Sequence, residues 1–69
     1  MLPKFKQNDY ITNGSELCKV LDLTIHGHSG VYVLEIINSV YGYTNPISII
    51  DKAYTLIENK QYLEYLYEL

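Results

Sequence analysis

The sequence holds a single cysteine and no tryptophan, and none of its apolar runs approaches the ~20 residues that span a bilayer. A lone cysteine forms no disulfide within the chain and leaves too few thiol ligands for a zinc cluster. A domain of 69 residues buries only about 60% of the surface that its unfolded chain exposes. We therefore expect a single domain over residues 1–69 that depends on efficient packing and self-association for its stability.

Basic residues are also scarce, and all five of them are lysines spread along a chain of net charge −3. Nucleic-acid binding normally needs clustered Lys and Arg to replace the counterions of phosphates, so direct binding to DNA or RNA is disfavoured. Lys4, Lys6, Asn8 and Asp9 lie where a secretion signal would need a continuous apolar stretch. Together with the unpaired cysteine, they favour a cytoplasmic protein without a membrane segment.

Tyrosine, in contrast, is abundant: the chain has eight, beside one phenylalanine, Phe5. Tyrosine combines a large apolar ring with a polar tip, which suits both half-buried strand faces and recognition surfaces. The apolar fraction of 48%, against 19% charged residues, is typical of a globular protein. The composition leaves open whether the tyrosines serve the fold or a partner.

Turn-forming residues divide the chain into segments of strand length. Asn13-Gly14, after the short segment 10–12, predicts a tight hairpin turn with positive φ angles. Segments 17–25 and 31–38 alternate and are rich in β-branched residues, so we predict two antiparallel strands joined through residues 26–30. Further turn formers stand at Gly42 and Asn45-Pro46. Uninterrupted alternation places one set of side chains on the same face of the first long strand: Cys18, Val20, Asp22 and Thr24.

Residues 45–57 admit two interpretations. Asn45-Pro46 is typical of a helix N-cap followed by proline at the first helical position, and apolar residues then recur at helical spacing. The alternative is a strand at 47–50, a tight turn at 51–53 and a strand at 54–57. The helical interpretation gives an α+β fold, with a three-stranded antiparallel sheet and helices from residue 46.

The opening Phe5-Lys6-Gln7-Asn8-Asp9-Tyr10-Ile11 resembles the F-K-x-G-D-(W/Y)-I opening of small SH3-like barrel proteins common in phages and gut-bacterial mobile elements. Later segments at 19–22, 32–34 and 47–56 are similar too, so the resemblance covers residues 5–57. It implies a mainly β fold, a five-stranded barrel with a 3₁₀-like turn at 51–53 before the closing strand. Asn8 replaces the usual glycine, and asparagine tolerates the left-handed conformation. The family implies a fold and a mobile-element setting, but no activity.

Residues 60–69 have no counterpart in that pattern and are predicted to form an added C-terminal helix. Its charged residues cluster on one side, and tyrosines and leucines cover the rest. So short a helix is unstable alone and must dock, either as a cap on the barrel or against a partner. The residues we expect to bind a partner lie on this helix and beside it: Tyr41, Tyr43, Tyr62, Tyr65, Leu66 and Leu69.

Few residues could carry chemistry. His26 and His28 with Cys18 are the only set that resembles metal ligands, but a glycine-rich turn would hold the histidines poorly, so we expect no metal or cofactor. Cys18, inside a predicted strand, should behave as an inert apolar residue. No serine lies in a Gly-x-Ser-x-Gly turn, and no loop has phosphate-binding spacing. The sequence therefore indicates that the protein is not an enzyme.

The carboxylates are scattered along the chain. We expect Asp9 to accept hydrogen bonds from nearby backbone amides of the first turn, and Asp51 to cap the short turn that follows it. Glu16 and Glu58 have the pattern of solvated charges. No spacing among these residues indicates an acid–base pair.

These features favour a non-enzymatic protein-binding module. We expect a phage or mobile-element accessory protein, in the host cytoplasm, that binds and modulates a host or defence protein and can form a homodimer. One alternative is a small barrel that binds single-stranded nucleic acid through its aromatic residues. Another is a structural or assembly subunit of a larger particle.

Overall fold

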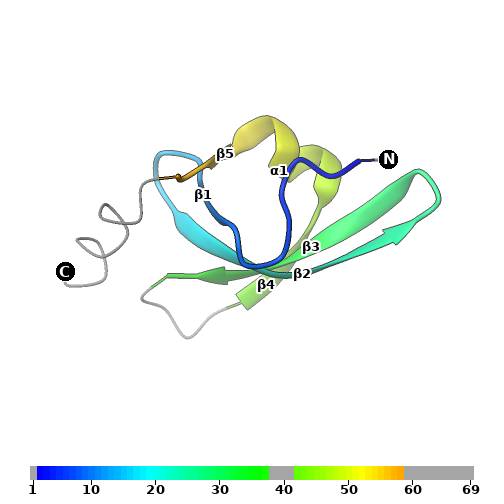
Figure 1. Ribbon diagram of the computed structural model, residues 1–69, viewed down its shortest axis with the longest axis horizontal. Coiled ribbons are helices and arrows are strands. Elements are labelled where there is room, and N and C mark those ends of the chain that lie inside the picture. The colour runs from blue at the N-terminus through cyan, green and yellow to red at the C-terminus, as the bar shows by residue number, and fades with distance from the viewer. Residues whose placement is uncertain (1, 38–41, 59–69) are drawn as a thin grey trace.

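The computed structural model describes residues 2–37 and 42–58, and in them the protein is mainly β (Figure 1). Five strands form one antiparallel sheet in the order β4-β3-β2-β1-β5. β4 and β5 are its two edges, so the sheet is open in the described part of the chain. The elements along the chain are β1 (Tyr10–Thr12), β2 (Leu17–His26), β3 (Ser29–Ile36), β4 (Gly42–Pro46), α1 (Ile47–Ala53) and β5 (Thr55–Leu56).

The hairpin of β2 and β3 is the longest element, and its prediction is confirmed. The pairing runs from Cys18 opposite Ile36 to His26 opposite Ser29. The connection is shorter than the predicted 26–30, because only Gly27 and His28 lie outside the strands. Gly27 has a φ of 60°, the positive value that the first position of a type II′ turn requires.

A β-bulge at Leu21 interrupts β2. The register shifts between Val20 and Asp22, so Leu21 is an extra residue on this strand. Before the bulge Val20 is buried, whereas after it Leu23 packs against the core and Asp22 and Thr24 are exposed. The predicted alternation, which placed Asp22 and Thr24 on the side of Val20, is therefore wrong beyond Leu21.

The region after residue 41 combines features of both sequence interpretations. Gly42–Pro46, whose residues suggested turns, is a strand that pairs with β3 from Val31 to Glu35. The helix α1 then begins at Ile47 with Pro46 as its N-cap, so the expected strand at 47–50 is wrong and the expected turn at 51–53 lies inside the helix. A strand does follow, as the second interpretation predicted, but it is limited to β5.

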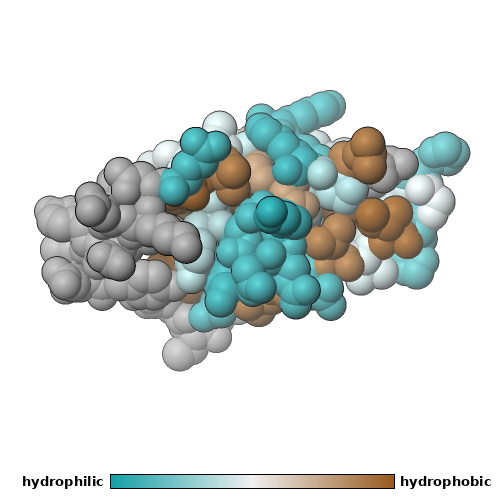
Figure 2. All heavy atoms as spheres, in the orientation of Figure 1, coloured by the Kyte–Doolittle hydropathy of each residue, from teal (hydrophilic) through white to brown (hydrophobic). Residues whose placement is uncertain are grey.

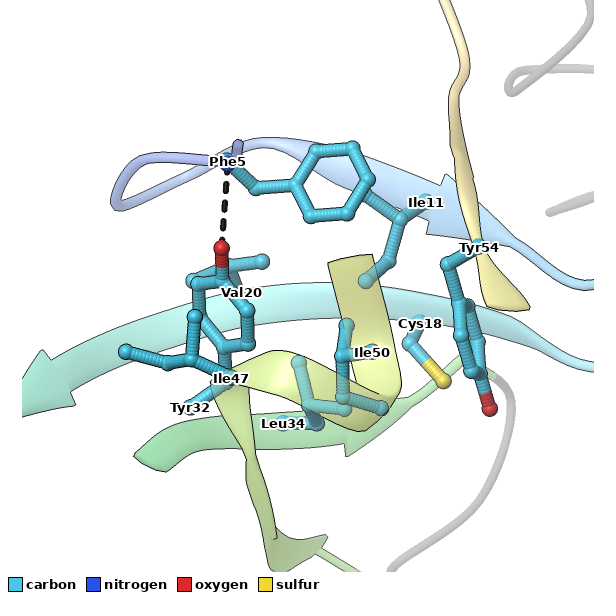
Figure 3. Packing of buried hydrophobic residues seen from close by; sticks show 9 residues of the cluster. All are labelled: Phe5, Ile11, Cys18, Val20, Tyr32, Leu34, Ile47, Ile50 and Tyr54. Atoms are coloured by element: carbon cyan, nitrogen blue, oxygen red, sulfur yellow. Dashed lines mark hydrogen bonds between the residues drawn. The ribbon is translucent and has the colours of Figure 1, made fainter. Parts of the chain in front are cut away.

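The core lies between the inner face of the sheet, helix α1 and the N-terminal segment (Figure 3). Helix α1 packs against β3 and β4. Three partly buried side chains, Leu23, Ile36 and Tyr43, border the core. The nine buried hydrophobic residues are Phe5, Ile11, Cys18, Val20, Tyr32, Leu34, Ile47, Ile50 and Tyr54.

Residues 4–9, which we call the strap, run along β2 before the first strand. The Asn8 amide donates to the Val20 carbonyl and the Val20 amide donates to the Asp9 carbonyl, each at 2.8 Å. Asn8 has a φ of 74°, so it occupies the left-handed conformation at the position where the resembling family has glycine. Asp9 accepts the Lys6 amide at 2.9 Å, which confirms its predicted role.

The connection between β1 and β2 differs from the prediction. It spans residues 13–16, and Gly14, not Asn13, has positive φ. The Asn13 side chain instead accepts the amides of Ser15 and Glu16 at 2.9 and 2.8 Å, an Asx turn. Asparagine therefore shapes this loop through its side chain, and the expected tight two-residue turn is wrong.

Candidate functional site

A first group of polar contacts, which we call the clasp, joins the strap to the sheet and to helix α1. The hydroxyl of Tyr32 on β3 accepts a hydrogen bond from the Phe5 amide at 3.1 Å (Figure 3). The same hydroxyl donates to Asp51 Oδ1 at 2.6 Å. The Lys4 amide donates to Asp51 Oδ2 at 3.2 Å, and Lys4 Nζ donates to the Tyr54 carbonyl at 3.3 Å. Lys4 Nζ also lies 5.3 Å from the centre of the Phe5 ring, within reach of a cation–π contact.

Asp51 therefore does not cap the turn after it, as the sequence indicated, but holds the strap. Burial raises the pKa of Tyr32 to about 12, and the hydrogen bond that it donates to Asp51 adds to the shift. The phenol is neutral at physiological pH and remains a donor to the carboxylate. The clasp thus stabilises the fold and offers no reactive group.

A second group, the tyrosine cluster, lies where β2 begins, and consists of Glu16, Cys18, Tyr43 and Tyr54. The hydroxyls of Tyr43 and Tyr54 donate to the same oxygen, Glu16 Oε2, at 3.1 and 2.8 Å. The two hydroxyl oxygens are 3.2 Å apart, and the sulfur of Cys18 lies 3.8 Å from the hydroxyl oxygen of Tyr43. Glu16, expected to be a solvated charge, is therefore held by two phenols.

Burial governs the protonation of this cluster. It raises the pKa of Tyr54 to about 12, and it raises the pKa values of Tyr43 and of the Cys18 thiol above their ordinary values. Cys18 is fully buried and free, as expected of an inert apolar cysteine. The thiolate is the nucleophilic form of cysteine, so a raised pKa and full burial oppose nucleophilic chemistry at Cys18.

Of the six residues predicted to bind a partner, the structure describes Tyr43 alone. Its side chain is partly buried, borders the core and points its hydroxyl into the tyrosine cluster. The other five predicted residues, as well as the predicted helix 60–69 that carries most of them, lie outside the described residues: Tyr41, Tyr62, Tyr65, Leu66 and Leu69.

The structure does not bring together the three residues that resembled metal ligands. His26 and His28 are exposed at the tip of the hairpin, whereas Cys18 is buried at the opposite end of β2. His26 is eight positions along the strand from Cys18, which amounts to roughly 25 Å. Within residues 2–37 and 42–58, no group of three His, Cys, Asp or Glu side chains could hold a metal ion. In the same residues, no helix is long and apolar enough to cross a membrane.

Exposed apolar side chains are the feature that sequence reasoning missed. Figure 2 shows apolar side chains gathered toward the end of the molecule from which the hairpin projects. The spacing of Ile47 and Ile50 could have indicated one of them, because a helix that buries both turns Ile49 outward. The exposed residues are Leu2 at 95%, Ile49 at 55%, Leu56 at 43%, Ile25 at 42% and Leu21 at 37%.

Comparison of the chain with models of protein families, with curated proteins and with solved structures yields no match. The functional argument therefore rests on the chain's own surface. That surface carries exposed aliphatic side chains, including those on the helix, the hairpin and the edge strand β5, whereas the two hydrogen-bonded tyrosine groups lie in and beside the core.

Proposed function

We propose that the chain is a non-enzymatic protein-binding module, a phage or mobile-element accessory protein that binds and modulates a host or defence protein in the host cytoplasm. The observation that carries the proposal is the apolar surface. Within residues 2–37 and 42–58, five large hydrophobic side chains are exposed beside a core of nine buried residues. Apolar side chains that gather on one part of a small protein mark partner sites, and such a group lies toward the hairpin end of this molecule (Figure 2).

The fold is consistent with the SH3-like barrel proteins that the sequence resembles. Asn8 adopts the left-handed conformation where that family has glycine. Five antiparallel strands are the number that the resemblance implies, although the helix α1 occupies the positions at which a strand at 47–50 and a 3₁₀-like turn at 51–53 were expected. We propose that the chain is a member of this group and that its sheet is a barrel of the same type.

The chemistry of the buried polar groups favours binding over catalysis. Raised pKa values keep Cys18, Tyr43 and Tyr54 neutral at physiological pH, so none of them is a nucleophile or a base there. The net charge of −3 and the absence of arginine favour a protein partner over a nucleic acid.

The test is quantitative capture of host proteins by the tagged full chain and by three variants. Leu66→Asp probes the predicted C-terminal surface. Ile49→Asp probes the exposed face of α1, and Ser48→Asp is its matched control, because it adds the same charge at a neighbouring exposed position. Circular dichroism checks that each variant folds.

We expect the unmodified chain to capture one stoichiometric host protein. Leu66→Asp or Ile49→Asp should lower the affinity for this protein at least about tenfold, a change of about 1.4 kcal/mol in the free energy of binding. Ser48→Asp should retain the affinity. Retention by all variants would show that the apolar surface is not the binding site. Absence of a stoichiometric protein, together with tight and steeply salt-dependent binding of single-stranded nucleic acid, would replace the proposal with the nucleic-acid alternative.

A further inference from the structure

The outer edge of β2 is paired along only part of its length. β1 pairs with Leu17 to Lys19, and the strap pairs with Val20. Beyond Val20, no strand in residues 2–37 and 42–58 pairs with this side of β2, where the hairpin projects from the sheet (Figure 1). The hairpin therefore presents an open strand edge from Leu21 to the turn at Gly27.

Hydrogen-bond geometry shows which backbone groups face outward. The Leu23 amide is bound by the side chain of Asp22, at 2.8 Å, so it does not point toward β3. Residues of an antiparallel strand alternate in the side toward which their amide and carbonyl point. Leu23 and Ile25 thus offer their backbone groups to the open edge, and Thr24 bonds inward to Val31.

This edge is complementary to itself. The open stretch runs from residue 21 to residue 27, and its middle residue is Thr24. A second copy, rotated by a twofold axis at Thr24, would place its Ile25 opposite Leu23 and its His26 opposite Asp22. An apolar residue would then face an apolar residue, and a carboxylate would face an imidazole that can donate to it.

We propose that two copies of the chain pair antiparallel along the outer edges of β2, about a twofold axis at Thr24, and join their two sheets into one. Leu23 and Ile25 exchange backbone hydrogen bonds with Ile25 and Leu23 of the second copy. In the dimer, the hydrogen bond from the Leu23 amide to the Asp22 carboxylate is broken. The carboxylate instead accepts a hydrogen bond from the imidazole of His26 of the second copy.

The exposed Leu21 and Ile25 flank this edge, so pairing also covers apolar surface. In the single chain, Asp22 covers the outward amide of Leu23, as charged side chains do on edges that avoid uncontrolled pairing. This inference does not depend on the proposed function, since its partner is a second copy of the chain and its experiments measure pairing between the copies alone.

Disulfide cross-linking tests the register directly, with oxidised glutathione as the oxidant. In the proposed dimer the two Thr24 Cα atoms lie about 4.5 Å apart, within the range of about 4.4–6.8 Å that a disulfide bridges. Thr24→Cys should therefore form a covalent dimer. Asp22→Cys and His26→Cys should each form no covalent dimer alone, because the two copies of either residue are roughly 14 Å apart. A mixture of these two variants should cross-link.

The unmodified chain is the background control, since its Cys18 is buried. A second test exchanges Asp22 and His26 and needs no cross-links. Sedimentation velocity over a range of concentrations measures the affinity of the dimer. Asp22→His and His26→Asp each place like residues opposite one another and should weaken the dimer about tenfold. The double variant restores unlike pairs and should recover the affinity.

Three results would overturn the proposal. One is a monomer at all concentrations without cross-linking of Thr24→Cys. Another is a dimer in which His26→Cys alone cross-links as readily as Thr24→Cys. The third is a dimer that neither Asp22→His nor His26→Asp weakens, which would indicate pairing through another surface. Capture of no stoichiometric host protein by an unmodified chain that still dimerises would instead count against the proposed function alone.

Discussion

The Tyr32 hydroxyl lies 2.6 Å from Asp51 Oδ1, and this bond joins the middle of the sheet to helix α1. The same hydroxyl accepts the Phe5 amide, so one buried oxygen holds a strand, a helix and the strap. The rings of Phe5 and Tyr32 lie with their centres 6.0 Å apart beside it.

Removal of the Tyr32 hydroxyl oxygen should lower the stability of the protein. Tyr32→Phe should lower the free energy of unfolding by about 2 kcal/mol, because the Asp51 carboxylate and the Phe5 amide both lose a buried partner. Urea denaturation measures the change. Asp51→Asn is the matched variant: its amide oxygen can still accept from Tyr32, so we expect a smaller loss. If the Tyr32→Phe protein is as stable as the unmodified chain, the hydrogen bonds of the clasp contribute nothing to the free energy of unfolding.

Alkaline pH should destabilise the protein through its buried phenols. The pKa values of Tyr32 and Tyr54 are raised to about 12, above an unfolded value of about 10. The unfolded state therefore loses these protons first, and stability that is complete below about pH 10 falls as the pH rises toward about 12. We expect a loss of about 2 kcal/mol for each tyrosine.

Urea denaturation at a series of alkaline pH values, followed beside the absorbance of tyrosinate, checks this expectation. Tyr54→Phe should have a shallower decline of stability with pH, since one of the groups responsible is gone. If the decline has the same slope in this variant, Tyr54 titrates alike in both states and its burial has no energetic effect.

Gly30 should resist replacement for steric reasons. A Cβ at this position would collide with the Thr24 carbonyl and lie 2.8 Å from Ile47 Cδ1 at the start of α1. Gly30→Ala should therefore cost about 2 kcal/mol, since an overpacked core must shift backbone. Ser29→Ala, at the neighbouring exposed position, should cost less than about 0.5 kcal/mol. Thermal unfolding compares the two, and equal effects would mean that the hairpin adjusts freely.

Asn8 should tolerate glycine but not alanine. Its φ of 74° is accessible to glycine without strain, whereas alanine is disfavoured there by about 1–2 kcal/mol. Asn8→Ala should accordingly lower the unfolding free energy by about 1 kcal/mol, and Asn8→Gly should leave it unchanged or raise it. The same melting temperature for both variants would contradict the assignment of strain to this residue.

Sequence reasoning located the hairpin because its signals are local. Alternation and a glycine turn specify β2 and β3, and the pairing of the two strands confirms the predicted hairpin. It missed β4 because Gly42 and Pro46 disfavour strands, and that strand exists through its pairing with β3. A strand at 54–57 was one of two interpretations, and it is limited to β5 because its extent depends on the pairing of Leu56 with Ile11, far away in the sequence.

The candidate site was harder to predict for the same reason. Glu16 resembles a solvated charge because its partners, Tyr43 and Tyr54, are 27 and 38 positions away. The bulge at Leu21 has no local signature, yet it determines that Leu23 and not Thr24 faces the core. Contacts between distant segments, which a single sequence does not display, decide both features.

The clasp also bears on how fast the protein folds and unfolds. Lys4 and Asp51 are 47 positions apart, so closing their contact costs more chain entropy than forming the hairpin. The clasp should therefore close after the rate-limiting step of folding. Weakening it, for example by Asp51→Ala, should accelerate unfolding in stopped-flow experiments and leave the refolding rate nearly unchanged. The two ends of the described chain thus govern how long the native state lasts, and the hairpin governs how quickly it forms.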